Sequence, residues 1–157
     1  AGMDAEAVDR VYRDWVTQHG QPKALPFPHA EEMLRRFQAA GGRNFVFTHR
    51  SGSVHDYLAG AGLTGYFQDV VSAGSRFERK PSPAGNLYLL STHGLDPVRT
   101  LAVGDRELDM LAAKGAGVDG CRFTPEGEAE EESCARWHIR SFAELAEILE
   151  LPEEEAR

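Results

Sequence analysis

The stretch LAVGDRELDMLAAKGAG, residues 101–117, decides the fold of this chain. Its apolar start predicts a buried strand, Gly104 predicts a sharp turn, and the alanine-rich remainder predicts a helix. Two acids, Asp105 and Asp109, stand four residues apart where the strand gives way to the helix. In parallel α/β sheets, ligands bind beyond the C-terminal ends of the strands. The pattern therefore predicts a functional site at this turn.

The same order of strand and helix recurs along the chain, which predicts βαβ units and a parallel sheet. We therefore expect an α/β fold with a three-layer, Rossmann-like parallel sheet. A capping box, in which Ser141 precedes Glu144 by three residues, predicts the start of the last helix. The expected strands are 43–49, 69–73, 100–104, 118–123 and 137–141, and the expected helices are 8–20, 28–40, 51–61, 82–93, 107–117 and a last one from 141.

Length and composition predict one soluble globular domain, with 157 residues of which 41% are hydrophobic. We expect an N-terminal helix and linker over residues 1–27, an α/β core over 28–150 and an acidic tail over 151–157. No apolar run approaches the roughly 18 residues of a membrane span, and the N-terminus has no apolar signal segment. Cys121 and Cys134 lack metal-ligand spacing. These features predict a cytoplasmic protein with two reduced thiols and no membrane partner.

The net charge of −8 belongs to the C-terminal part of the chain. Residues 126–157 hold 11 acids and 3 bases, whereas residues 1–125 hold 14 of each. A phosphate backbone attracts the opposite sign of charge, so we expect no nucleic acid partner.

Polar and charged side chains follow three of the predicted strands. Thr48, His49 and Arg50 follow the first, Lys80 lies in the loop after the second, and the two aspartates follow the third. Hydroxyls, cations and carboxylates together suit a phosphoryl group and a magnesium ion. Each has an ordinary structural alternative: Asp105 as a helix cap with Asp109 exposed, Thr48 as a strand-end threonine, and Lys80 as a solvated loop lysine.

Three segments resemble signature motifs of the haloacid dehalogenase superfamily, above all its phosphoglycolate-phosphatase-like phosphohydrolases. FVFTHR at 45–50, RFERKPSP at 76–83 and the opening stretch at 101–117 resemble the second, third and fourth motifs, and the similarity covers residues 28–150. The resemblance implies that Thr48 binds the phosphoryl group and that Lys80 steadies the nucleophile and the phosphate. It also implies that Asp105 and Asp109 serve Mg²⁺. His49 and Arg50 follow the threonine, where members vary, and join the predicted phosphate-binding residues.

The first motif of that superfamily, a strand ending in D-x-D-x-T whose first aspartate attacks phosphorus, has no counterpart before Phe45. Asp4, Asp9 and Asp14 do not follow a strand, and residues 4–20 resemble the last helix of the family's small cap. The missing strand would be central, between the strands at 43–49 and 100–104. About ten unpaired backbone groups would cost more than roughly 10 kcal/mol. Three outcomes stay open: a longer protein, closure of the two strands on each other, or a strand from a second chain.

The sequence thus predicts a magnesium-dependent phosphohydrolase domain for a small phosphomonoester, catalytically incomplete without its nucleophile. The main alternative is a degenerate domain that binds a phosphorylated ligand or a partner without turnover. A receiver-like domain is a third hypothesis, although its acidic pair after the first strand is also absent. Nothing in the sequence indicates the halide site of the dehalogenase branch.

Overall fold

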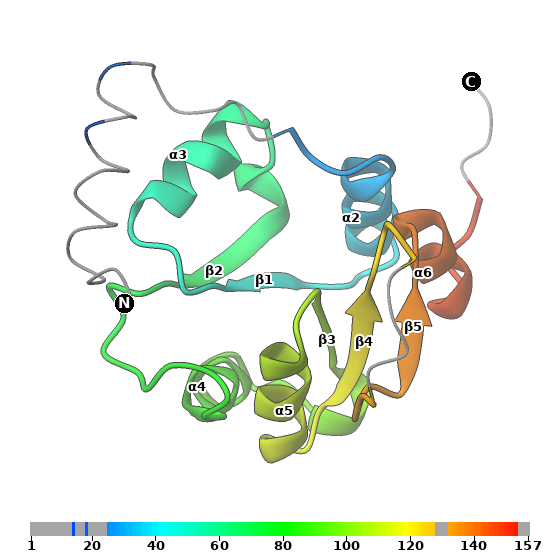
Figure 1. Ribbon diagram of the computed structural model, residues 1–157. Helices are drawn as coiled ribbons and strands as arrows, with labels where there is room; N and C mark the ends of the chain where they lie inside the picture. The colour runs from blue at the N-terminus through cyan, green and yellow to red at the C-terminus, as the bar shows by residue number, and fades with distance from the viewer. Residues whose placement is uncertain (1–13, 15–17, 19–24, 128–131, 154–157) are drawn as a thin grey trace.

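The computed structural model describes residues 25–127 and 132–153, together with Asp14 and Gln18 (Figure 1). The helix expected at 8–20, with its likeness to a cap helix, lies outside the described residues except for those two, which are both helical. Strands and helices alternate as expected. The strands are β1 Asn44–Phe47, β2 Phe67–Val71, β3 Leu101–Gly104, β4 Asp119–Phe123 and β5 Trp137–Ile139. The helices are α2 Ala30–Ala39, α3 Ser53–Gly60, α4 Ala84–His93, α5 Glu107–Gly115 and α6 Phe142–Ile148, with short 3₁₀ turns at Thr64–Tyr66 and Pro97–Arg99.

A local sequence signal explains the start of α6 but not that of α3. The Ser141 hydroxyl accepts the Glu144 N–H at 3.3 Å and caps α6, as the sequence predicts. No side chain among the described residues caps α3, because Gly52 occupies the N-cap position. The two serines beside it, Ser51 and Ser53, are within hydrogen-bond distance of each other instead, at 3.3 Å.

The strands form two parallel sheets rather than one. β1 pairs with β2, while β3, β4 and β5 form a separate sheet in that order. β1 and β3 share no hydrogen-bonded ladder in the described part of the chain. Of the three outcomes left open by the missing first strand, direct pairing of these two strands is therefore wrong. The Rossmann-like α/β fold is confirmed, with its parallel strands divided between β1 and β3.

The larger sheet is covered on both faces. Side chains alternate along β4, as the pleat of a strand requires. Cys121 and Phe123 belong to the buried cluster shared with α2 and α6, whereas Gly120 faces α5, where an added Cβ would lie 2.6 Å from the Met110 sulfur. Figure 1 shows α5 on one side of this sheet and α6 on the other. This half of the molecule therefore has the expected three layers.

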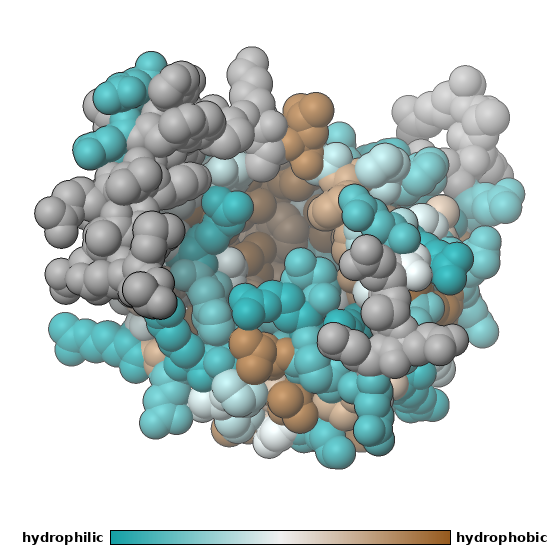
Figure 2. All heavy atoms as spheres, viewed as in Figure 1, coloured by the Kyte–Doolittle hydropathy of each residue, from teal (hydrophilic) through white to brown (hydrophobic). Residues whose placement is uncertain are grey.

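Between the two sheets lies an apolar cavity of about 870 Å³. Both facing strands contribute to its wall, through Phe45 and Phe47 of β1 and residues 101–103 of β3. Its remaining walls come largely from α2, α4 and α6. Figure 2 shows a surface hollow between α2 and α3 in which hydrophobic side chains gather. The place of the expected central strand is thus a hydrophobic groove.

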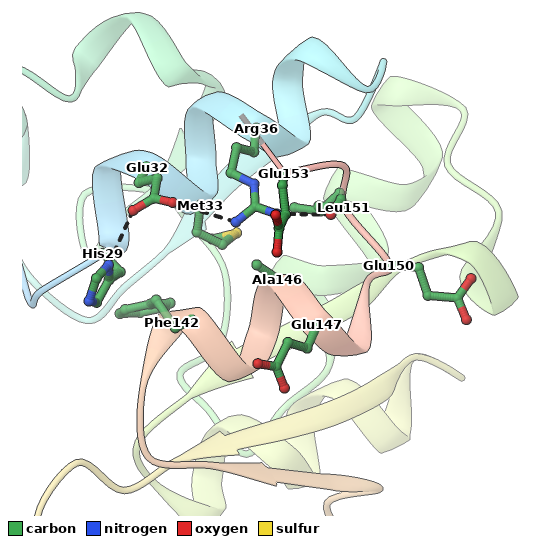
Figure 3. Close-up of a pocket in the computed structure, with 11 residues that line it drawn as sticks. His29, Glu32, Met33, Arg36, Phe142, Ala146, Glu147, Glu150, Leu151 and Glu153 are labelled. Carbon is green, nitrogen blue, oxygen red and sulfur yellow. Dashed lines mark hydrogen bonds and ion pairs between the residues drawn. The ribbon is translucent and has the colours of Figure 1, made fainter. Parts of the chain in front are cut away.

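A second, smaller cavity of about 480 Å³ lies between α2 and α6 (Figure 3). The Arg36 guanidinium on α2 donates to the carbonyl of Leu151 at 2.8 Å and to that of Pro152 at 2.9 Å. These bonds fix the segment after α6 against α2. No helix in the described ranges is both long and apolar enough to cross a membrane.

A partly buried polar contact ties α4 to β2. One carboxylate oxygen of Asp69 lies 2.8 Å from His93 Nε2, and its other oxygen accepts the Val70 N–H at 2.8 Å. The hydrogen bond to His93 is the main cause that holds the pKa of Asp69 below its usual value, although burial opposes it.

We predict that this contact adds acid-sensitive stability. A carboxyl with a lowered folded-state pKa stabilises the fold fully above its unfolded pKa of about 4, and the contribution is lost as pH falls through the folded pKa. Asp69→Asn should therefore lower the free energy of unfolding at pH 7, and the two proteins should converge as the pH drops below about 4. Urea titrations across pH measure this, with Asp56→Asn, at an exposed residue of α3, as the control. A wild type minus Asp69→Asn difference that does not change with pH would contradict the assignment.

Candidate active site

The Lys80 ammonium brings three separate segments together at the C-terminal edge of the strands. Its Nζ donates to the Phe47 carbonyl at the end of β1, at 2.8 Å, and to Asp109 Oδ1 on α5, at 2.5 Å. It also lies 4.4 Å from the centre of the Phe47 ring. The Lys80 side chain is only 11% exposed and that of Asp109 only 15%. Lys80 is therefore a partly buried, paired cation and not a solvated loop lysine.

Asp109 bonds to the first turn of α5 as well as to Lys80. Its Oδ2 accepts the Arg106 N–H at 3.1 Å, which satisfies a backbone group at the helix start. Gly104 makes this position possible, because a Cβ there would lie 2.5 Å from the Asp109 carboxylate. The structural alternative for the two aspartates is thus reversed: Asp109 supports the helix start and is largely buried, while Asp105 is exposed.

Thr48 follows β1 and shapes the turn behind it. Its N–H donates to the Val71 carbonyl at 2.9 Å, which extends the pairing of β1 with β2 by one residue. Its hydroxyl oxygen accepts the Arg50 N–H at 3.1 Å, so the hydroxyl proton can still be donated to a ligand. The Arg50 guanidinium lies 4.3 Å from the centre of the Tyr57 ring, on the α3 side of the turn.

His49 contacts the Lys80 loop directly. Its Nε2 accepts the Lys80 backbone N–H at 2.9 Å. Burial is the main cause that lowers the pKa of His49, and the positive charges of Lys80 and Arg79 add to the effect. A neutral ring with Nε2 as acceptor carries its proton on Nδ1.

The structure therefore brings Thr48, His49, Lys80 and Asp109 to one edge. Sequence analysis missed the Phe47 carbonyl, since a backbone acceptor leaves no mark in residue type. It also missed Glu107, whose carboxylate accepts from Arg122 at 3.0 Å and from the Cys134 N–H at 2.8 Å. The bond from Arg122 ties β4 to α5, and the bond from Cys134 ties the chain before β5 to α5. From the sequence alone, Glu107 and Arg122 would be interpreted as two ordinary surface residues.

The donor set at this edge suits a hard cation that keeps most of its waters. Within the described ranges, no group of three or more histidine, cysteine, aspartate or glutamate side chains is arranged to hold a metal. Asp105 offers an exposed carboxylate directly after β3, whereas the carboxylate of Asp109 is bonded to Lys80. Of the two aspartates, Asp105 is the residue that could ligate a magnesium ion directly, because the Asp109 carboxylate is bonded to Lys80 and to the Arg106 N–H.

The sequence profile of the haloacid dehalogenase-like hydrolases matches residues 2–123. The chain belongs to this family. The match agrees with the motif resemblance and with the parallel α/β fold. Thr48, Lys80 and the two aspartates lie in the three segments that resemble the second, third and fourth motifs of this family.

Relatives within the family include phosphoglycolate phosphatases. The chain is 34% identical over 143 residues to "Phosphoglycolate phosphatase" of Vibrio vulnificus, covering 88% of this chain and 63% of the relative. It is 37% identical over 96 residues to that of Rhodospirillum rubrum, covering 60% of this chain and 40% of the relative. The chain therefore spans less than two thirds of these relatives.

Solved structures of the family share the fold. A HAD phosphatase from Thermococcus onnurineus superposes with a TM-score of 0.75 at 25% identity, covering 88% of this chain and 64% of that one. A predicted phosphoglycolate phosphatase from Haemophilus somnus gives a TM-score of 0.78 at 25% identity, covering 94% of this chain and 68% of that one.

The two family aspartates should differ sharply in their effect on stability. Asp109→Asn leaves the partly buried Lys80 ammonium without its counter-charge, which should cost about 1–3 kcal/mol of unfolding free energy. Asp105→Asn changes an exposed side chain and should stay within about 0.5 kcal/mol. Denaturant unfolding of both variants checks this. Equal losses from the two substitutions would show that the ion pair with Lys80 does not support the fold.

Proposed function

We propose that this chain is the core of a magnesium-dependent phosphohydrolase for a small phosphomonoester, of the phosphoglycolate phosphatase kind. The observation that carries the proposal is the meeting of Lys80, Asp109 and the end of β1 beside Thr48. These side chains come from the three segments that carry the family motifs. The names of the relatives support the phosphatase chemistry.

Each residue has a role that its surroundings allow. The Thr48 hydroxyl proton and nearby backbone N–H groups bind phosphoryl oxygens. Lys80 supplies positive charge to the phosphoryl group and to an attacking carboxylate. Arg50, at the same turn, adds a second cation for an anionic substrate. Asp105, supported by Asp109, holds Mg²⁺, and such an ion neutralises charge that develops on the transferred phosphoryl group.

The nucleophile belongs in the groove between β1 and β3. No strand among the described residues occupies it, and Lys80 and Asp109 line the cavity at the strands' C-terminal edge. The Nδ2 amide of Asn44 is buried there without a hydrogen-bond partner. Unpaired strand edges readily accept another strand. We therefore propose that an extended apolar segment ending in D-x-D-x-T docks parallel to β1 and β3, and places its first aspartate beside Lys80.

That segment comes either from a longer version of this chain or from a second chain. An extended segment with apolar side chains on both faces would fit the groove, because helices cover both sides of the sheets. The non-catalytic alternative, a degenerate domain that binds a phosphorylated ligand, predicts that supplying such a segment restores no activity.

Magnesium binding should depend on the exposed aspartate. We expect weak binding by the 157-residue chain, since most ligands would be water. Asp105→Asn should abolish it, and Asp109→Asn should weaken it. Titration calorimetry measures the affinities, with Asp56→Asn as a control for general loss of negative charge. An unchanged affinity in Asp105→Asn would place the ion elsewhere.

Activity should require the segment. The 157-residue chain alone should hydrolyse p-nitrophenyl phosphate no faster than its Asp105→Asn variant. Addition of a synthetic apolar peptide ending in D-x-D-x-T, or its fusion upstream, should give magnesium-dependent turnover that a chelator stops. The same peptide with its first aspartate changed to asparagine should bind without restoring turnover. Robust turnover by the chain alone, lost in Asp105→Asn, would show that another carboxylate attacks.

A further inference from the structure

His49 and Lys80 are joined by a bond that no phosphate-binding role explains. Lys80 is held at both ends by residues close together in the chain: its ammonium by the Phe47 carbonyl and its backbone N–H by the ring of His49. We propose that His49 is a positioning residue, whose ring nitrogen accepts the Lys80 backbone N–H and thereby fixes the turn that places the Lys80 ammonium. The bond itself stands on geometry alone, while its importance for phosphoryl binding rests on the function proposed above.

The loop between β2 and α4 has few other ties to this region that fix Lys80. At its start, the Ala73 N–H donates to the Arg50 carbonyl at 2.8 Å. At its end, the Ser82 N–H donates to the Arg79 carbonyl at 3.0 Å, which closes a turn around Lys80 without attaching it to β1. The bond to His49 attaches this turn to the segment after β1. The long, flexible lysine side chain then starts from a fixed backbone point.

The ring is well placed for this task. It lies edge-on to the Phe47 ring, with centroids 6.5 Å apart at 81°, so aromatic packing limits its rotation. The charged groups around it are Lys80 and Arg79 on its loop, and Asp109 and Arg106 at the start of α5. Three of these four carry positive charge and disfavour a cationic ring. Burial and these charges keep the pKa of His49 low, so Nε2 stays free to accept.

The two roles for His49 predict opposite responses to acid. A histidine that binds an anion directly binds it more tightly once protonated, because it gains a charge and a donor. A histidine that holds the Lys80 turn loses its acceptor when Nε2 is protonated. The turn is then released, a further cation faces Lys80 and Arg79, and anion binding weakens. The sign of the pH dependence therefore separates the roles.

Nuclear magnetic resonance of the 157-residue chain tests the bond itself. In His49→Ala, exchange of the Lys80 backbone amide should accelerate by about tenfold, the effect of losing one hydrogen bond of roughly 1.4 kcal/mol. The protected Lys80 ammonium signal should also disappear. His49→Gln should keep both signatures, since the glutamine carbonyl can accept the same N–H and does not titrate. His55→Ala, at an exposed histidine of α3, is the matched control.

Sulfate is the probe for the role in anion binding, because its charge does not change between about pH 8 and about pH 5. Wild type should bind sulfate more weakly once the pH falls below the pKa of the His49 ring, which a nuclear magnetic resonance titration of that ring locates. His49→Gln should show a flat profile, and His49→Ala should bind weakly throughout. Tighter sulfate binding on acidification, or Lys80 signals unchanged in His49→Ala, would overturn the proposal. Absence of sulfate binding by the wild type would contradict the proposed phosphoryl site, while the Lys80 signals would still decide the role of His49.

Discussion

The ion pair of Lys80 with Asp109 is the constraint on which the rest of the site depends. Phe47 ends β1 in one sheet, and Asp109 follows β3 of the other, so one ammonium bridges the two sheets at their C-terminal edge. A partly buried cation requires such partners, since removal of its charge from water is otherwise costly. Gly104 leaves room for the carboxylate, and His49 fixes the backbone from which the lysine extends.

Behind that bridge lies the groove between β1 and β3, where two strand edges are unpaired within the described residues. Two parallel edges face each other across an apolar cavity of about 870 Å³, and neither satisfies the other. Strand edges and apolar walls of this kind favour a docked strand. The same strand would bring a carboxylate to Lys80, so completion of the fold and completion of the catalytic site are one event in the proposed mechanism. In the proposed mechanism, this coupling is what would distinguish the chain from a domain that has merely lost a catalytic residue.

Sequence analysis located the strand ends that carry the site because the motifs lie at fixed places relative to buried strands. Thr48, Lys80 and Asp109 do come together at one edge, whereas the absence of a first motif before Phe45 left open whether β1 and β3 pair with each other. It could not assign separate tasks to the two aspartates. Both follow β3 within one turn, and only the backbone path at Gly104 turns Asp109 inward and leaves Asp105 exposed. It also could not foresee that the ring of His49 bonds a backbone N–H.

By itself, the sequence determined the class of fold, the family and the edge at which chemistry is expected. Hydrophobic periodicity and short motifs are local properties, and they survive without knowledge of long-range contacts. Only the tertiary structure decided that β1 and β3 stay apart, that Lys80 forms an ion pair with Asp109, and that His49 faces Lys80 rather than open solvent. The two contacts of Lys80 join residues about 30 positions apart in the sequence. Such contacts, like the separation of the two strands, depend on how sheets and loops pack, and residue type alone does not encode their geometry.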